Sequence, residues 1–254
     1  MRAKGSDWAR GFFTGAGLEV VRDPERERTA PLEADWIVRV LELRPGDRLL
    51  DVPCGSGRIA ARLAESGVRV TGIDRSPVML REARQRCRGL AAPPVFRPGD
   101  MRRLAEPPRF QAAINWWGSF GYFSDEENEA TVAGLAAALC PGGRLLIDAP
   151  NREHVRRWAL GRHEIAWEDV HIHHEVAWNG ATERIEGEWL LVRRGRPRRL
   201  YSSIRLYTPA QMRQLAERAG LVGVRLFGDW MGAPYQRGSL RCVLCARRPG
   251  PAGG

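Results

Sequence analysis

The chain has little lysine, no long apolar run and only one closely spaced cysteine pair. Lys4 is the only lysine, so nearly all the positive charge behind the formal net charge of +10 is arginine, scattered through every segment. A nucleic-acid surface concentrates its charge, so this scatter disfavours a nucleic-acid partner despite the basic balance. No apolar stretch reaches the length of a membrane span, and we expect no membrane association.

The chain has few cysteines, and their number is odd. There are five, an odd count, they lie within expected structural elements, and no signal peptide precedes them. We therefore expect a reduced, cytoplasmic protein. Cys242 and Cys245 have the C-x-x-C spacing, but no second pair exists to complete a zinc site. Residues three apart in a strand point to opposite faces, so we interpret both as structural and expect no metal.

Residues 49–58, with the sequence Leu-Leu-Asp-Val-Pro-Cys-Gly-Ser-Gly-Arg, are the most informative stretch. Apolar residues close a buried strand, glycines allow a tight turn close to a ligand, and residues 59–64 begin a helix. The spacing of Gly55 and Gly57 also fits the G-x-G-x-x-G/A fingerprint of dinucleotide enzymes. The turn therefore indicates a nucleotide site and leaves the choice of nucleotide open.

Asp51, at the end of this strand, helps to make that choice. A dinucleotide would lay its pyrophosphate on the turn and on the positive end of the following helix, where a carboxylate would tend to repel it. S-adenosylmethionine has no phosphate and carries an ammonium and a sulfonium, which a carboxylate attracts. The charge of Asp51 favours S-adenosylmethionine.

Two more acids follow at the ends of later strands. Asp74 closes the β-branched strand 69–74 and can accept both ribose hydroxyls of a nucleoside, a role common to both cofactors. Asp100 ends a third strand, where it can accept the adenine amino group while Met101 packs on the ring. Three acids at three successive strand ends are a stronger signal than one glycine turn.

With these pieces in order, the chain resembles the class I S-adenosylmethionine-dependent methyltransferases over most of its length. The matching segments are 50–58, 70–80, 99–102 and 139–148. Residues 119–123 and 203–207 are also similar to a bacterial group of small-molecule methyltransferases. Pro53 and Ser56 depart from the small residue and threonine common in such enzymes, and Pro53 removes a backbone donor from the loop. The resemblance implies a donor site formed by Asp51, Pro53, Gly55, Gly57, Asp74, Arg75, Asp100, Met101 and Asn115, with S-adenosyl-L-homocysteine as product.

The order of elements predicts one α/β domain over residues 1–254, with a doubly wound, seven-stranded, mostly parallel Rossmann-like sheet. Helices expected at 6–13 and 31–43 form an N-terminal helical lid, residues 1–45. The cofactor-binding core spans 46–160. Residues 161–207 alternate apolar with polar between Gly and Pro turns, which predicts an antiparallel β insertion after the fifth strand; the resemblance implies that it covers the acceptor pocket. Residues 208–254 finish the core sheet.

The acceptor side is predicted from the aromatic segment after the fourth strand. In-line methyl transfer mainly needs alignment, so little acid or base machinery is required and no catalytic residue is assigned. Trp116, Phe120 and Tyr122 suit an apolar or flat acceptor, with core packing as the alternative. The N-P-P-aromatic, Lys-Asp-Lys-Glu and Pro-Cys signatures of amide, ribose and cytosine methylation are missing. We expect transfer to an oxygen or nitrogen of a small molecule; an RNA methyltransferase and a non-methylating protein that retains the site are the alternatives.

The remaining ionisable candidates lie in the expected insertion. His171 and His173 share one strand face with Glu175, where they could meet an acceptor proton or a metal; solvent-exposed hairpin residues are the favoured interpretation. Arg205 could bind an acceptor carboxylate, or it could form an ion pair that fixes the insertion.

Overall fold

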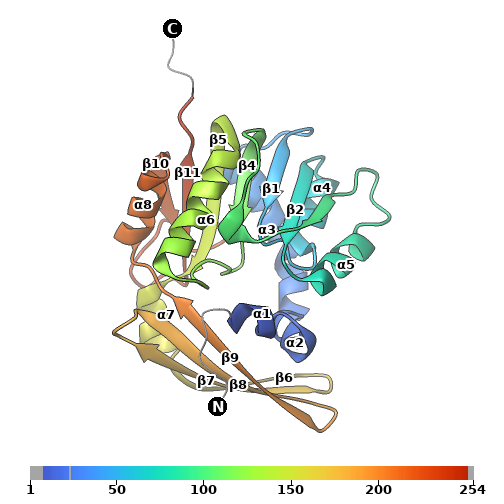
Figure 1. The fold of residues 1–254 in the computed structure, drawn as a ribbon, viewed down its shortest axis with the longest axis vertical. Coiled ribbons are helices and arrows are strands. Elements are labelled where there is room, and N and C mark those ends of the chain that lie inside the picture. Colours follow the sequence, from blue (N-terminus) through green and yellow to red (C-terminus); the bar gives the residue numbers. More distant parts are fainter. Residues whose placement is uncertain (1–7, 23, 251–254) are drawn as a thin grey trace.

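The computed structural model describes residues 8–22 and 24–250, and its centre is a seven-stranded sheet (Figure 1). The strands lie in the order β10-β11-β5-β4-β1-β2-β3, and β11 runs antiparallel to both of its neighbours. The other pairings are parallel. This is the doubly wound, mostly parallel sheet that the sequence predicts. Its strands are β1 (Arg48–Asp51), β2 (Arg69–Asp74), β3 (Val95–Pro98), β4 (Phe110–Asn115), β5 (Leu139–Pro150), β10 (Val222–Phe227) and β11 (Arg241–Arg247).

Helices cover both faces of this sheet, because successive strand residues point to opposite sides. Leu49 packs into a core with α3 (Pro24–Val40), α4 (Arg58–Glu65) and α5 (Pro77–Arg86), whereas Leu50 packs into a second core with α6 (Asp125–Ala138) and α8 (Pro209–Arg218). Cys245 and Cys242 divide between the same two cores, so they lie on opposite faces as expected and are unpaired.

A second sheet follows the helix α7 (Arg152–Trp158), in the order β6-β7-β8-β9 with every pairing antiparallel. Its strands are β6 (Gly161–Trp167), β7 (Val170–Asn179), β8 (Arg184–Arg193) and β9 (Arg196–Arg205). The predicted antiparallel insertion after the fifth strand is confirmed.

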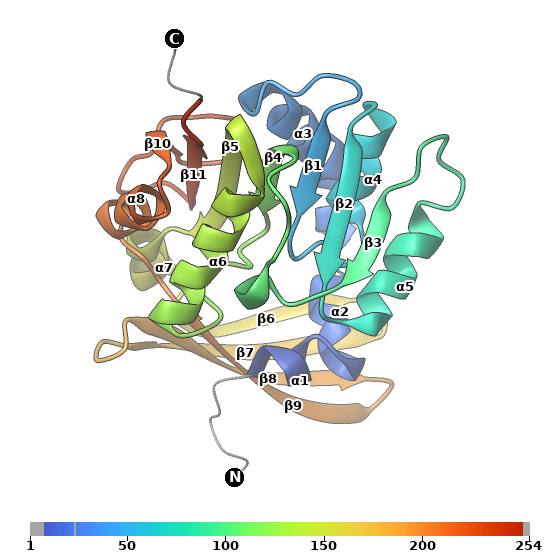
Figure 2. The same ribbon diagram turned by 45° about the horizontal axis from the view of Figure 1, so that its top comes forward.

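Short N-terminal helices lie between the two sheets (Figures 1 and 2). They are α1 (Trp8–Phe12), the 3₁₀ turn η1 (Gly15–Gly17) and α2 (Leu18–Val21), and α1 packs against β9. Ser6 and Asp7, at the start of the helix expected at 6–13, lie outside the described residues. The remaining element is the 3₁₀ turn η2 (Met101–Arg103).

The second expected helix begins earlier than predicted. The prediction placed this helix at residues 31–43, but α3 begins at Pro24, continues through Pro31 and ends at Val40. Packing of Ala30, Trp36 and Ile37 against the core outweighs the local signal. Within the described part of the chain, no helix is long and apolar enough to cross a membrane.

Candidate donor and acceptor site

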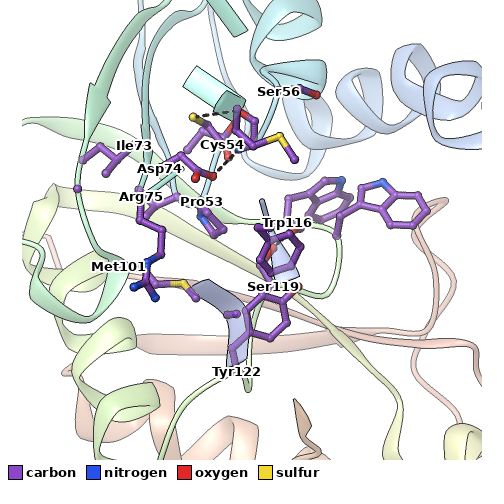
Figure 3. Close-up of a pocket in the computed structure, with 18 of the residues that line it drawn as sticks. Pro53, Cys54, Ser56, Ile73, Asp74, Arg75, Met101, Trp116, Ser119 and Tyr122 are labelled. Atoms are coloured by element: carbon purple, nitrogen blue, oxygen red, sulfur yellow. Dashed lines mark hydrogen bonds between the residues drawn. The ribbon is translucent and has the colours of Figure 1, made fainter. Parts of the chain in front are cut away.

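The parallel pairing of β1 with β2 and β4 brings the ends of these strands to one edge of the sheet. Asp51 is paired with Gly72 and Ile114, so the residues that follow each strand meet around one cavity. Ala9 of α1 and Phe13 close the opposite side. Asp51, Pro53, Gly55, Asp74, Arg75, Asp100 and Met101, all predicted from the sequence, line this cavity. Figure 3 shows Asp74 and Arg75 along one side of it and Trp116, Ser119 and Tyr122 along another.

Asp51 is a buried carboxyl at the floor of the cavity, only 2% exposed. Burial, and then the charge of Asp74, raise its pKa to about 8, while the charge of Arg58 acts in the opposite direction. A cation placed beside Asp51 would therefore be strongly favoured, because it would relieve the cost of ionising this group.

Asp74 is also buried, but the backbone supports it. Its two carboxylate oxygens accept from the amides of Gly55, at 2.9 Å, and Ser76, at 2.8 Å. Burial raises its pKa and these amides oppose the rise. Gly55 has a φ of 53°, the left-handed region that glycine enters freely, so the turn can direct its amide at Asp74. Each oxygen keeps a lone pair for a ligand hydroxyl.

Asp100 differs from the other two acids because a neighbouring arginine already binds it. The Arg102 guanidinium donates Nε to its Oδ1 at 3.0 Å and Nη2 to its Oδ2 at 2.6 Å. Burial opposes ionisation, yet these bonds hold the pKa of Asp100 below its ordinary value. Asp100 is therefore a carboxylate at neutral pH and remains an acceptor on the cavity wall.

Gly57 and Asn115, two residues of the predicted donor site, do not line the cavity. Gly57 precedes α4 with a φ of 73°, and a Cβ there would lie 2.9 Å from the Cβ of Ala83, so this glycine serves close helix packing. Asn115 is fully buried and donates its side-chain amide to the carbonyl of Val52 at 2.9 Å. It braces the strand end instead of facing a ligand.

Aromatic side chains line another part of the cavity, and two of the three aromatics predicted for the acceptor are among them. Trp116 and Tyr122 line it together with Phe13, Trp117 and Ser119. Tyr122 stacks on Phe13 with ring centroids 5.6 Å apart. Burial raises the pKa of Tyr122 to about 12, so it keeps its proton at neutral pH.

Phe120 and Arg205 were wrongly predicted to line the acceptor pocket. Phe120 is 1% exposed and packs on Tyr207, with centroids 5.3 Å apart. Arg205 is buried in ion pairs with Asp125 at 3.0 Å and Glu183 at 2.6 Å. The alternative interpretation of Arg205, an ion pair that fixes the insertion to the core, agrees with the structure.

The histidine cluster also lies away from the cavity. His171 and His173 are exposed on the outer face of the second sheet, where His173 pairs with Glu164 at 3.1 Å. His174 points to the other face and stacks on Trp189, and burial lowers its pKa to about 4. The candidate role of His171 and His173 at an acceptor or metal is thus wrong. Among the described residues, no cluster of His, Cys, Asp or Glu could hold a metal ion.

Sequence reasoning missed two of the three arginines that line the cavity, Arg26 and Arg58. Both guanidinium groups lie over the Trp117 ring, at 4.4 and 5.2 Å from its centroid. A signal was present: an amino-acid cofactor brings a carboxylate as well as an ammonium, and Arg58 directly follows the glycine turn.

The insertion contributes no residue to the lining of the cavity. Every residue that lines it comes from the core or from the N-terminal segment, so in the described structure the insertion supports the acceptor side indirectly. Trp189 of β8 packs edge to face on Phe12 of α1 at 5.4 Å. The insertion was expected to cover the acceptor pocket, but α1 and Phe13 cover the cavity instead, and the second sheet packs behind them.

Comparisons with known proteins agree with this geometry. The family model described as "Methyltransferase domain" matches residues 49–143. A ubiquinone biosynthesis O-methyltransferase of Alkalilimnicola ehrlichii is 32% identical over 124 residues, which cover 48% of this chain and 49% of that protein. The chain thus spans about half the length of this curated relative.

Solved structures match over more of the chain. The CcbJ methyltransferase of Streptomyces caelestis has a TM-score of 0.76 at 20% identity, covering 87% of this chain and 90% of that one. The sugar N-methyltransferase KedS8 of Streptoalloteichus has a TM-score of 0.66 at 27% identity, covering 85% and 87%. Residues 49–143 thus match a methyltransferase domain, and the chain as a whole has the fold of S-adenosylmethionine-dependent methyltransferases of known structure.

Proposed function

We propose that the protein transfers a methyl group from S-adenosylmethionine to an oxygen or nitrogen of a small-molecule acceptor. The observation that carries the proposal is the cavity itself, which three acids, three arginines and several aromatic rings line. The donor is the one typical of the family, and the residues present fit its chemistry.

The donor is a nucleoside joined to a zwitterion, and the cavity offers a partner for each part. We assign the ribose hydroxyls to Asp74 and the adenine amino group to Asp100, with Met101 against the ring. The α-ammonium is assigned to Asp51 and the α-carboxylate to Arg58. Arg58 is close enough to lower the pKa of Asp51, which supports this last assignment, since the two ligand charges share one carbon.

The aromatic side of the cavity is suited to aligning the acceptor with the donor, and less to acid or base catalysis. A sulfonium donor is already activated, so the protein mainly has to hold the acceptor in line and exclude water. Phe13, Trp116 and Tyr122 provide flat apolar surface for this purpose. The protonated Tyr122 hydroxyl can donate to or accept from an acceptor atom, which would orient it.

The names of the relatives support a small acceptor. One solved neighbour is titled an amino pentose methyltransferase and another a sugar N-methyltransferase, while the curated relative is an O-methyltransferase of ubiquinone biosynthesis. Both oxygen and nitrogen acceptors occur among them, so the proposal includes both.

Calorimetry tests the donor assignment directly. S-adenosylmethionine and S-adenosylhomocysteine should both bind, and NAD should not. Asp74→Ala should weaken binding by about 1–3 kcal/mol, because it removes a charged acceptor for the ribose hydroxyls. Asp47→Ala, just before β1 and outside the cavity, is the control. Binding of NAD alone would contradict the proposal.

A further inference from the structure

Glu33 is a buried carboxylate that joins three parts of the molecule behind the cavity. It lies on α3, is 2% exposed and does not itself line the cavity. Its two oxygens accept five hydrogen bonds from four side chains, at the following distances: Thr29 at 2.6 Å, Arg58 at 2.8 and 2.9 Å, Trp116 at 2.7 Å and Trp117 at 2.6 Å. Apart from Thr29, these partners all line the cavity.

Glu33 is held ionised by this arrangement. Burial opposes its charge, but the bonds and charge of Arg58, together with the bonds from Thr29 and Trp116, keep its pKa below the ordinary value. Burying a carboxylate without partners is costly, whereas burying one whose lone pairs all accept hydrogen bonds can be favourable. Each partner of Glu33 is therefore held in one defined position.

Glu33 fixes the Arg58 guanidinium but does not occupy all of its N–H groups. One terminal nitrogen donates to Glu33 and to the carbonyl of Arg26, and the other donates to Glu33. A guanidinium has five N–H groups, so the N–H of Nε and one hydrogen on Nη2 are not used by these bonds. A second acceptor, such as a ligand carboxylate, can therefore bind without displacing Glu33.

Trp117 shows how firmly the wall is held. Its φ is 62°, a left-handed conformation that costs a bulky residue about 1–3 kcal/mol. The bond to Glu33 and the tilted packing on Trp230, with ring centroids 4.7 Å apart, hold the ring in place. Backbone strain of this kind persists only where surrounding contacts determine the conformation.

We propose that Glu33 is a positioning residue for the amino-acid end of the methyl donor: it fixes the Arg58 guanidinium for the donor carboxylate, and it fixes Trp116 and Trp117 beside it. This inference rests on the proposed function. Glu33 acts through Arg58 and has no contact with the ligand of its own.

The test compares two ligands, one with and one without the amino-acid group that Arg58 is proposed to bind. S-adenosylhomocysteine carries the amino-acid group, and 5′-methylthioadenosine shares its adenosine and thioether but lacks that group. Glu33→Gln keeps the shape of the side chain and removes the charge opposite Arg58. Affinity for S-adenosylhomocysteine should fall about tenfold or more, whereas affinity for 5′-methylthioadenosine should change less than about twofold.

Glu27→Gln is the matched control. Glu27 lies on the same helix and pairs with Arg86 at 2.7 Å, and neither residue lines the cavity. Its replacement should leave both affinities unchanged. If Glu33→Gln does not fold, Glu33→Asp keeps the charge but withdraws it by one methylene, and it should show a smaller loss with the same selectivity.

A double-mutant cycle shows whether Glu33 acts through Arg58. Arg58→Met should lose affinity for S-adenosylhomocysteine selectively, and adding Glu33→Gln should cost less than it does alone. Equal losses for both ligands, or fully additive losses, would overturn the inference and leave the proposed function standing. Failure of the wild-type protein to bind either ligand would overturn the proposed function itself.

Discussion

At the scale of single residues, the acids of this site differ in how many donors surround them. Asp100 and Glu33 receive arginine bonds, and their pKa values lie below the ordinary range. Burial raises the pKa values of Asp51 and Asp74, and the groups around them oppose that rise only in part. Carboxyl groups in and beside one cavity thus have pKa values shifted in opposite directions, according to the donors that each one meets.

Asp51 predicts a specific pH dependence of stability. Its pKa is about 8 in the folded protein and near 3.8 when unfolded, so the folded state binds the extra proton between these values. The free energy of unfolding should therefore decrease as pH rises, by about 2 kcal/mol between pH 6 and pH 8. Urea unfolding of the ligand-free protein at several pH values measures this change.

Asp51→Asn is the corresponding control, since it cannot ionise. The stability difference between the variant and the wild type should grow in favour of the variant across the same pH range. Parallel pH profiles for the two proteins would show that Asp51 does not titrate there.

At the scale of elements, the N-terminal segment and the second sheet act as one support for the cavity. Phe13 stacks on Tyr122, and its carbonyl accepts from the Ser76 hydroxyl at 3.1 Å. Phe12, on the other side, packs on Trp189 of β8. The segment therefore joins the cavity to the sheet behind it, and contacts there should control how fast a ligand leaves.

Phe13→Ala should speed dissociation of S-adenosylhomocysteine about fivefold, because it removes an aromatic pair worth about 1 kcal/mol from the cover of the cavity. Stopped-flow fluorescence measures the dissociation rate. Trp158→Ala, at a side chain that is 64% exposed on α7, should leave it unchanged. An unaltered rate in the Phe13 variant would exclude a gating role for this segment.

Arg205 offers a prediction about the attachment of the insertion. Arg205→Met should lower the free energy of unfolding by about 1–3 kcal/mol, since Glu183 and Asp125 lose a buried partner, while affinity for S-adenosylhomocysteine stays the same. Chemical denaturation and calorimetry measure the two quantities.

Arg218→Met is the surface comparison. Arg218 pairs with Glu129 at 3.5 Å and is 63% exposed, so its loss should change stability by less than about 0.5 kcal/mol. A stable Arg205 variant with lost ligand affinity would restore a binding role for Arg205.

At the scale of the whole molecule, the elements that line the cavity meet at one edge of the central sheet. A group of exposed arginines lies away from that edge, in the second sheet. Residues 193–199 contain five arginines, all exposed around the β8–β9 turn. Two of them, Arg193 and Arg194, pair with Asp169 at 3.6 and 2.7 Å. Internal pairing of this kind reduces the charge available to a polyanion.

We expect RNA to bind only in the nonspecific range at 150 mM salt, with a dissociation constant of about 1–100 µM, and not to accept methyl groups. Filter binding of transfer RNA over a salt series and transfer of labelled methyl groups measure both properties. Submicromolar binding with a steep salt dependence, together with label in RNA, would instead support an RNA methyltransferase.

Local patterns predicted the strands and their end residues well, because strand alternation and glycine turns are encoded within a few neighbours. Asp51, Asp74 and Asp100 were found in this way. The extent of α3 was predicted poorly, since the predicted helix began at Pro31, whereas the helix starts at Pro24 and passes through that proline. Phe120 illustrates a related error: sequence placed it near the site, and only packing turns it toward Tyr207.

By itself, the sequence determined the doubly wound sheet, the antiparallel insertion and the three acids at the strand ends that line the cavity. These depend on periodicity and on the order of strands, which neighbouring residues encode. The tertiary structure alone decided that Glu33 binds Arg58 and two tryptophans, that Arg205 is an internal ion pair, and that His171 and His173 face outward. Such pairings join residues far apart in the chain, and their formation depends on how helices and sheets pack together.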